Sequence, residues 1–230
     1  GVLPVIWKVC GGSGEVGGFR RVGWRGTGGN FCAGGAIKDM ASARQSPRTQ
    51  HSGAVIAYSR AFGTRLRKVN AAPQAVIAIL EGAVLGGGFG LCCVSDVAIA
   101  VSDAKFGLPE TGLGLPPAQI APFVVERIGL TQARRLGVCG GRFNGEEAER
   151  LGLVHFVEAD TAAVDKRLAE VVEQIRRCAP KANAVTKRIM LGVSQANPED
   201  LLDDAAREFA ECLRSDEGTE GTMAFIEKRL

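Results

Sequence analysis

The sequence has little histidine, no large excess of charge and no long apolar run. With only 2 His in 230 residues, a metal site built on imidazole is not expected. The formal net charge is only +3, and Lys and Arg are interspersed with Asp and Glu along most of the chain, which disfavours a nucleic-acid partner. No apolar run reaches the ~20 residues that cross a bilayer, so no membrane partner is expected.

The cysteines also lack the spacings of a metal site. There are 7, an odd number, scattered through mostly apolar surroundings and without a CxxC pair. This usage is typical of reduced thiols, and we expect no metal and a cytoplasmic location. No secretory signal is recognisable at Gly1, and we expect that the native start is missing.

The apolar content, 46%, is enough for one large domain or a domain with a small appendage. Two short apolar runs, Ala75–Leu80 and Val97–Val101, predict buried strands. Between them lie the glycine-rich turn EGAVLGGG and a predicted buried helix over Phe89–Val94. Strand, turn, helix and strand in this order predict an α/β unit with parallel strands.

After Pro116 the sequence pattern is mainly that of helices. Leu153–Val157 predicts one more short strand, and no internal repeat is recognisable. We therefore expect a core over residues 1–160 and a helical region over residues 161–230. The predicted helices of that region are Ala162–Arg177, Ala182–Val193, Leu201–Leu213 and Thr219–Arg229.

The first thirty residues contain a misleading motif. Gly12, Gly14 and Gly17 spell GxGxxG, the dinucleotide-binding pattern. That pattern needs a helix at the turn, whereas GFRRVGWRGTGG follows here and is a poor helix. We interpret Gly11–Gly29 as an irregular, glycine-rich segment and not as a nucleotide site.

A second glycine cluster, Gly86–Gly88, lies between the first predicted strand and the buried helix. Glycine permits positive φ and close backbone approach, and free amides at a helix start stabilise negative charge. A tight turn needed only for packing is the alternative. The segment Phe31–Met40 (FCAGGAIKDM) could present one more amide, but by itself it is only a turn.

Glu110 is the candidate acid or base. It follows the second predicted strand in Phe106-Gly-Leu-Pro-Glu110 and has apolar neighbours. A carboxyl group in apolar surroundings has a raised pKa and can exchange protons near neutral pH. An exposed loop glutamate is the more ordinary alternative.

Taken in order, five segments resemble the enoyl-CoA hydratase/isomerase (crotonase) family. The resemblance begins near Arg25 and runs to the C-terminus. The segments are FCAGGAIKDM, GAVLGGGFGLCCVSDVAIA, AKFGLPETGLGLPPAQIAPFVVERIG, RFNGEEAERLGLVHFV and EGTEGTMAFIEKR.

The resemblance implies an α/β crotonase (ClpP/crotonase-like) fold of repeated ββα units with a helical C-terminal region, and an enzyme of the hydro-lyase type. Glu110 would be the catalytic carboxylate, and the amides of Ala33 and Gly87 would form the oxyanion hole. The ligand would be an acyl-CoA thioester, with coenzyme A as part of the substrate and no separate cofactor. The implied substrate-binding and CoA-binding residues are Cys32, Gly34, Ala36, Ile37, Lys38, Gly86, Gly88 and Pro109.

The finer resemblance is to isohexenylglutaconyl-CoA hydratases of acyclic terpene breakdown, with methylglutaconyl-CoA hydratases as cousins. Such substrates carry a second carboxylate, which an Arg or Lys must neutralise. Gly90 replaces the second glutamate of many hydratases, so a Δ3,Δ2-enoyl-CoA isomerase with one Glu base is an alternative. A non-catalytic acyl-CoA-binding remnant is another.

Two further departures concern the front of the chain. Ala36 stands where the family usually has Asp, and Gly1–Gly23 lacks the family's first strands. We expect a truncated or misread N-terminus. The resemblance also implies a homotrimer or hexamer, with the C-terminal helices used in oligomerisation.

Overall fold

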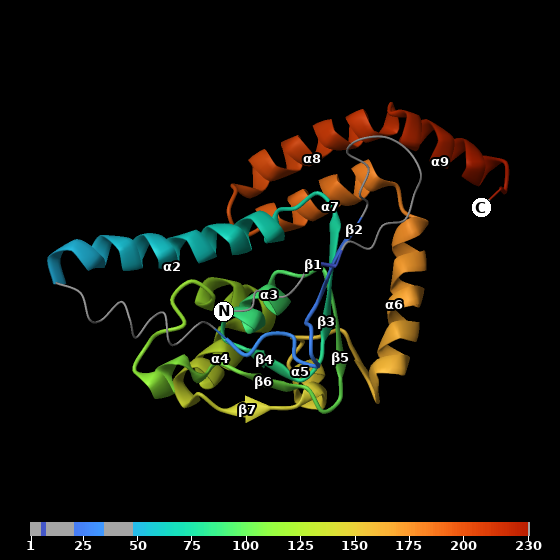
Figure 1. Cartoon of the computed structure of the whole chain (residues 1–230). Helices are drawn as coiled ribbons and strands as arrows, with labels where there is room; N and C mark the ends of the chain where they lie inside the picture. Colours follow the sequence, from blue (N-terminus) through green and yellow to red (C-terminus); the bar gives the residue numbers. More distant parts are fainter. Residues whose placement is uncertain (1–5, 8–20, 35–47, 230) are drawn as a thin grey trace. The chain divides into compact units, whose positions relative to one another are not determined.

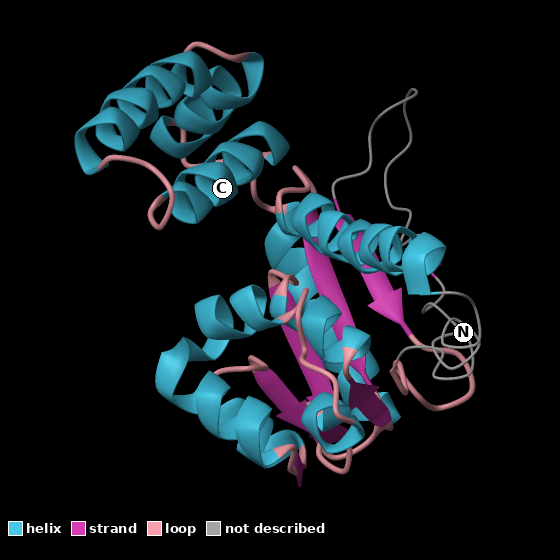
Figure 2. Cartoon of the chain, turned by 90° about the vertical axis from the view of Figure 1, so that its left-hand side faces the viewer, coloured by secondary structure: helices cyan, strands magenta, loops and turns pink. Residues whose placement is uncertain are grey.

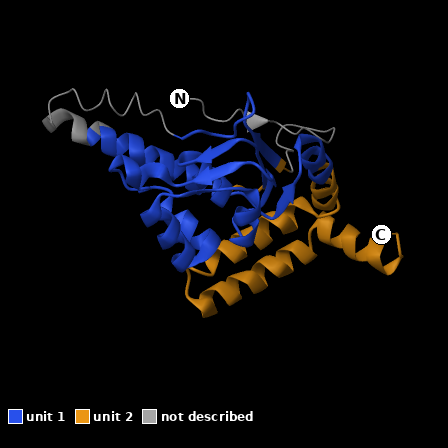
Figure 3. Cartoon of the chain, turned by 90° about the horizontal axis from the view of Figure 1, so that it is seen from below, with its two compact units in different colours: residues 1–9, 22–70, 76–168 blue, residues 10–21, 71–75, 169–230 orange. Residues whose placement is uncertain are grey.

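The computed structural model describes residues 6–7, 21–34 and 48–229 (Figure 1). Predicted site residues Ala36, Ile37 and Lys38 lie outside these ranges, as do the three glycines of the GxGxxG motif. The chain divides into two compact units (Figure 3). Unit 1 includes 22–70 and 76–168, and unit 2 includes 71–75 and 169–230. The predicted division at residue 160 stays a prediction.

The larger sheet has five strands in the order β1-β2-β3-β5-β8. Strands β3 and β5 are parallel, with Ile77 opposite Val97, as the sequence predicts for its α/β unit. Strand β8 extends the parallel part, whereas β1 and β2 form an antiparallel pair. The strands are β1 (Ile6–Trp7), β2 (Arg21–Arg25), β3 (Ala75–Leu80), β5 (Val97–Val101) and β8 (Phe156–Glu158).

The smaller sheet has the order β4-β6-β7, formed by Ala83–Leu85, Lys105–Gly107 and Arg142–Phe143. Strands β4 and β6 are parallel, and β6 and β7 are antiparallel. Cys32 adds a parallel bridge to Val84 on the other edge of β4. The smaller sheet therefore brings together three chain segments that run in one direction.

Successive segments repeat one pattern of two strands and a helix. In β3–β4–α3 and again in β5–β6–α4, the first strand joins the larger sheet and the second joins the smaller one. Strand β2, the Cys32 bridge and α2 follow the same order. The helices are α2 (Arg48–Asn70), α3 (Gly87–Cys93) and α4 (Ala121–Cys139).

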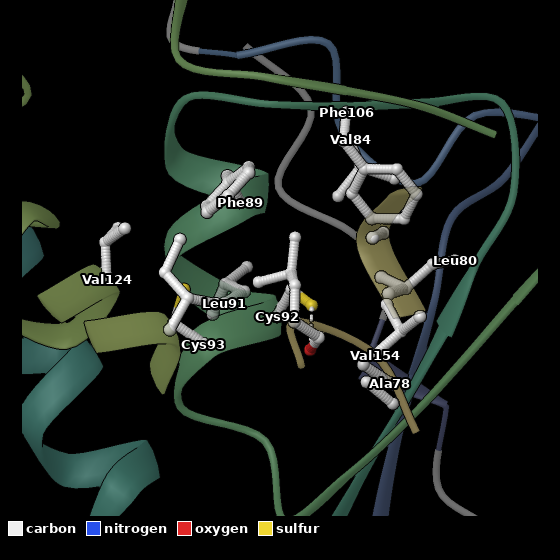
Figure 4. Packing of buried hydrophobic residues seen from close by; sticks show 14 of the residues in the cluster. Ala78, Leu80, Val84, Phe89, Leu91, Cys92, Cys93, Phe106, Val124 and Val154 are labelled. Carbon is white, nitrogen blue, oxygen red and sulfur yellow. Dashed lines mark hydrogen bonds between the residues drawn. The ribbon is translucent and has the colours of Figure 1, made fainter. Parts of the chain in front are cut away.

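The core of unit 1 lies between the sheets and α3. Phe106 stacks on Phe143 at a ring-centroid distance of 5.7 Å, and Phe89 meets Phe143 edge-on at 6.2 Å. Figure 4 shows Phe89 and Cys92 of α3 pointing toward Val84 and Leu80 of the strands. Each fully buried Leu or Phe contributes about 1.5–3 kcal/mol. Cys92 is part of this core, and burial raises its thiol pKa to about 12, which is expected of a packing residue rather than a nucleophile.

The chain after β7 is mainly helical, and the regular structure within residues 169–229 is all helical (Figure 2). Side chains of Asn144, Asn197 and Ser215 accept hydrogen bonds from amides in the first turns of α5, α8 and α9, which satisfies donors without helical partners. No helix in the described ranges is long and apolar enough to cross a membrane. These helices are α5 (Gly145–Arg150), α6 (Thr161–Arg176), α7 (Pro180–Gly192), α8 (Pro198–Leu213) and α9 (Asp216–Ile226).

Two predictions of irregular structure are wrong. Arg21–Arg25, within the segment expected to be irregular, is strand β2, and Ala83–Leu85, assigned to a turn, is strand β4. Both strands are short, and β2 contains a glycine, so their local preference for a strand is weak. Pairing with neighbouring strands therefore decides that these residues form strands. The ion pair of Arg25 with Glu81, at 2.8 Å, also holds the end of β2 beside the end of β3.

Candidate active site

The three glycine- and glutamate-containing motifs meet at one edge of the smaller sheet. The Cys32 bridge, β4 and β6 are parallel, so their carboxyl ends lie at the same edge. Gly86 follows β4, and Glu110 follows β6 after Leu108 and Pro109. The Cys32 amide donates to the Ala83 carbonyl at 2.8 Å, which fixes the first motif beside the second.

Residues 32–34 run alongside residues 86–88. A methyl group placed on Gly88 would lie 2.6 Å from Cβ of Cys32, and one placed on Gly86 would lie 3.7 Å from Cα of Gly34. Ala33 and Gly87 are therefore the middle residues of the two segments that approach each other. Gly86 has φ 52° and ψ −115°, a conformation that residues with a side chain avoid.

The amides of Ala33 and Gly87 are candidate donors to a ligand. Gly87 is the first residue of α3, where an N–H group has no acceptor in its own helix. Within residues 21–34 and 48–229, no backbone oxygen accepts a hydrogen bond from the Ala33 amide. Two such amides can stabilise an oxygen that gains negative charge.

The Glu110 carboxyl group lies beside these backbone segments. A methyl group placed on Gly86 would lie 2.9 Å from its Oε1. The other oxygen, Oε2, is buried and has no hydrogen-bond partner among the described residues. Burial raises the pKa of Glu110, and a backbone hydrogen bond opposes that shift. This carboxyl is thus poised to hold or release a proton.

Glu110 is positioned by a 3-10 helix, Pro109–Leu113. Half-buried Pro109 is its first residue and fixes the local backbone. The Leu115 amide donates to the Glu110 carbonyl at 3.0 Å, and the Thr111 hydroxyl donates to the Gly137 carbonyl of α4 at 3.0 Å. The short helix is therefore held to a longer one.

The wall beside this site is apolar. A methyl group placed on Gly90 would lie 2.5 Å from Cγ2 of Ile120 and 3.3 Å from Cδ1 of Leu66. One placed on Gly87 would lie 3.1 Å from Cζ of Phe62. There is consequently no room at position 90 for a second carboxylate. Phe62, Leu66 and Ile120 were not among the predicted site residues, because their contacts with Gly87 and Gly90 join segments that are distant in the sequence.

His155 lies outside this constellation. Its Nδ1 accepts a hydrogen bond from the Ala98 amide of β5 at 2.9 Å, and burial lowers its pKa. That geometry assigns the ring a structural role between β5 and β8. Within the described residues, no group of three or more His, Cys, Asp and Glu side chains could hold a metal ion.

Residues 20–230 match the sequence family described as enoyl-CoA hydratase/isomerase. Among solved structures, Pseudomonas aeruginosa AtuE is 60% identical with a TM-score of 0.87, over 91% of this chain and 80% of that one. An enoyl-CoA hydratase/isomerase from Marinobacter aquaeolei is 53% identical with a TM-score of 0.86, over the same shares of the two chains.

Curated relatives agree with this family. A probable enoyl-CoA hydratase of Bacillus subtilis is 32% identical over 165 residues, 71% of this chain and 64% of its own. The mitochondrial methylglutaconyl-CoA hydratase of Mus musculus is 28% identical over 205 residues, 87% of this chain and 63% of its own. The chain thus spans less than two thirds of the length of these two relatives. From the family match and these structural neighbours, the chain belongs to the enoyl-CoA hydratase/isomerase family and has the crotonase fold.

Proposed function

We propose that this chain hydrates a branched, carboxylated enoyl-CoA thioester of the isohexenylglutaconyl-CoA kind, in acyclic terpene breakdown or a related pathway. One observation carries the proposal. The carboxyl of Glu110 lies beside Gly86, which in turn approaches Gly34, and these two glycines are next to the candidate amide donors Gly87 and Ala33. A candidate proton-transfer group and two candidate oxyanion donors would therefore meet at one place, which supports the proposal.

The reaction needs one base that later acts as an acid. Glu110 would remove a proton from water while the water oxygen bonds to Cβ of the enoyl group. The electrons of the double bond move toward the thioester, whose oxygen would accept hydrogen bonds from the amides of Ala33 and Gly87. Glu110 then returns its proton to Cα, so the enzyme ends in its starting state.

The raised pKa of Glu110 suits this double role. Because burial disfavours its ionised form, the carboxylate is a stronger base than a solvated one, and its acid form is easier to keep near neutral pH. General acid–base catalysis of this kind contributes about 10²–10⁴-fold in rate. We further propose a cytoplasmic homotrimer or hexamer that needs no cofactor beyond the coenzyme A of its substrate.

The proposed substrate class has two supports. The similarity to the mouse methylglutaconyl-CoA hydratase points to a branched acyl chain with a second carboxylate. The wall formed by Phe62, Leu66 and Ile120 would suit the apolar part of such a chain. Cys32, Gly88 and the segment with Lys38 are proposed to hold the coenzyme A part.

A Δ3,Δ2-enoyl-CoA isomerase is the second candidate. It is favoured by the packing of Ile120 and Leu66 over Gly90, which leaves one carboxylate at the site. Moving a double bond requires one group that takes a proton from one carbon and gives it to another, and no water is added.

The test is an assay of purified protein with 3-methylglutaconyl-CoA and isohexenylglutaconyl-CoA. Loss of the conjugated thioester absorbance is followed, and the product mass is measured. Gain of one water, abolished in Glu110→Gln, is the expected result and ranks the two substrates. An unchanged mass with a shifted double bond would assign the isomerase, and binding without any turnover would assign an acyl-CoA-binding remnant.

A further inference from the structure

A pair of polar side chains lies next to the apolar wall of the site. Phe62 of α2 packs against Gly87, and the next residue along the helix is Gly63. The side-chain oxygen of Gln119 lies directly over Gly63, and Nη1 of Arg60 would lie 3.3 Å from a methyl group placed there. Gln119 comes from the loop that follows Glu110, immediately before Ile120. Arg60 and Gln119 thus converge where two site-forming segments meet.

The charge of Arg60 has no carboxylate partner among the described residues. Its Nη1 donates to the Thr64 hydroxyl at 3.2 Å, a neutral acceptor one helical turn away. Elsewhere in unit 1, guanidinium groups such as those of Arg25 and Arg167 form ion pairs at 2.7–2.8 Å. The Arg60 side chain is exposed and Gln119 is partly exposed, so both remain accessible to a ligand.

We propose that Arg60 and Gln119 bind the second carboxylate of the acyl chain. This inference rests on the proposed function, because it names the groups that recognise its carboxylated substrate. A guanidinium offers a planar pair of donors that matches a carboxylate, and the Gln119 side-chain amide offers one more donor. Phe62, which contacts Gly87, is the neighbour of Gly63 in α2, so the apolar part of the acyl chain would pack near its ring.

The lack of a side chain at position 63 is what lets the two polar groups converge. Any Cβ at this position would meet the Gln119 side chain and displace it. Because Gln119 ends in a flexible side chain, the displacement should leave the fold intact. Alanine also favours helix more than glycine does. Gly63→Ala is therefore a way to disturb the pair without removing either charge or donor.

The same pair could instead bind a phosphate of coenzyme A, since both ligands are anionic oxygen groups. Two saturated thioesters distinguish binding of the second carboxylate from binding of a coenzyme A phosphate. Neither thioester can be hydrated or isomerised. 3-Methylglutaryl-CoA carries the second carboxylate, whereas butyryl-CoA has the same coenzyme A without it. Calorimetric titration of the wild type, Arg60→Ala, Gly63→Ala and the control Arg65→Ala gives a Kd for each ester.

For 3-methylglutaryl-CoA we expect Kd to rise about 10- to 100-fold in Arg60→Ala, the range of a lost charge-assisted hydrogen bond. Gly63→Ala should raise it several-fold, and Arg65→Ala should leave it unchanged. For butyryl-CoA all four proteins should have the same Kd. Equal losses for both esters in Arg60→Ala would assign the pair to coenzyme A and overturn the proposal, as would no loss for either.

Failure of the proposed reaction gives a different pattern. Suppose that the protein distinguishes the two saturated esters through Arg60 but adds no water to any enoyl-CoA. The carboxylate site is then supported, and the hydratase assignment is contradicted. If Arg60→Ala hydrates 3-methylglutaconyl-CoA with an unchanged KM, the hydratase assignment is supported and the carboxylate site at Arg60 is contradicted.

Discussion

The two units of this chain differ in how they bury apolar side chains. Every buried apolar residue in the described ranges belongs to unit 1, except Val171 and Ala224 of unit 2. In α8 no residue is buried, although apolar and polar side chains separate onto opposite faces. Leu202 and Phe209 of that helix are 64% and 69% exposed. Unit 1 is thus stabilised by its own core, whereas unit 2 presents apolar helix faces.

The same difference would separate the candidate site from the proposed assembly surface. Candidate residues Ala33, Gly87 and Glu110 lie in unit 1, where glycines are packed so closely that small changes should be costly. The exposed faces of unit 2 fit the proposed oligomer, in which another copy of the chain would cover them. Substitutions of matched size in the two units test this contrast directly.

The largest effect is expected for Gly90→Glu. The new side chain would meet Ile120 and Leu66 and bring a carboxylate into an apolar wall, so we expect about 3 kcal/mol or more of lost stability. Gly221→Glu in α9 is the matched control in unit 2, since nothing lies within 4 Å of a methyl group there. Urea unfolding gives both values, and the control should shift by less than about 0.5 kcal/mol.

A second substitution sharpens this result. Ile120→Gly should cost less stability in the Gly90→Glu protein than in the wild type, because there it also removes the side chain in closest contact with the new carboxylate. Equal unfolding midpoints for Gly90→Glu and Gly221→Glu would show that the wall is not packed as described.

Gly86→Ala comes next, with an effect mainly on rate. Its Cβ would approach Oε1 of Glu110, and its φ of 52° with ψ of −115° is unfavourable for alanine. We expect kcat/KM for the enoyl-CoA substrate to fall about 100-fold, because a displacement near 1 Å has that effect on positioned groups. Gly112→Ala, where a methyl group meets nothing within 4 Å, should keep its activity. Similar rates for the two variants would contradict the site geometry.

Leu202→Glu with Phe209→Glu should change association and not folding. The two side chains are seven residues apart and lie on one face of α8. We expect the mass in solution to fall toward that of one chain, with an unchanged far-ultraviolet circular dichroism spectrum; sedimentation velocity measures the mass. Asp203→Ala, on the same helix, is the control and should keep the oligomer. A monomeric wild-type protein would contradict the proposed oligomer.

The smallest effect is a gain of stability in Glu110→Gln. Because burial raises the pKa of Glu110, the folded protein binds this proton more tightly than the unfolded chain, so stability falls as pH rises through the folded pKa. Removing the charge should add about 1 kcal/mol at pH 8, since one carboxylate oxygen is buried without a partner.

This gain should depend on pH in one direction. It should shrink below the folded pKa and disappear below about pH 4, where glutamate is protonated in the unfolded chain as well. Thermal unfolding of both proteins between pH 4 and 8 measures it. A gain that grows on acidification would contradict the direction of the pKa shift.

Much of the fold was predictable from local pattern. The apolar runs at Ala75–Leu80 and Val97–Val101 coincide with β3 and β5, and their parallel pairing follows from the helix between them. The C-terminal helices were also recognisable, because helical periodicity is a strong signal over more than ten residues. Strand β8 is displaced from its predicted range, Leu153–Val157, toward the C-terminus by one to three residues.

The missed strands share a cause. With three residues in β4 and a glycine inside β2, neither run has enough local preference to distinguish a strand from a turn. The repeated order of two strands and a helix is likewise invisible in the residues. Each repeat places different side chains on the same framework, so the sequence shows no periodicity.

The sequence by itself determined the kinds of group available: a glutamate among apolar residues, two glycine-rich turns and no second carboxylate at Gly90. Only the tertiary structure decided their arrangement. Residues 32–34 meet residues 86–88 because three parallel segments end at one edge of the smaller sheet, and Ile120 covers Gly90 from thirty residues away. Local propensity carries no information on such contacts, since they are set by packing between segments that are distant in the chain.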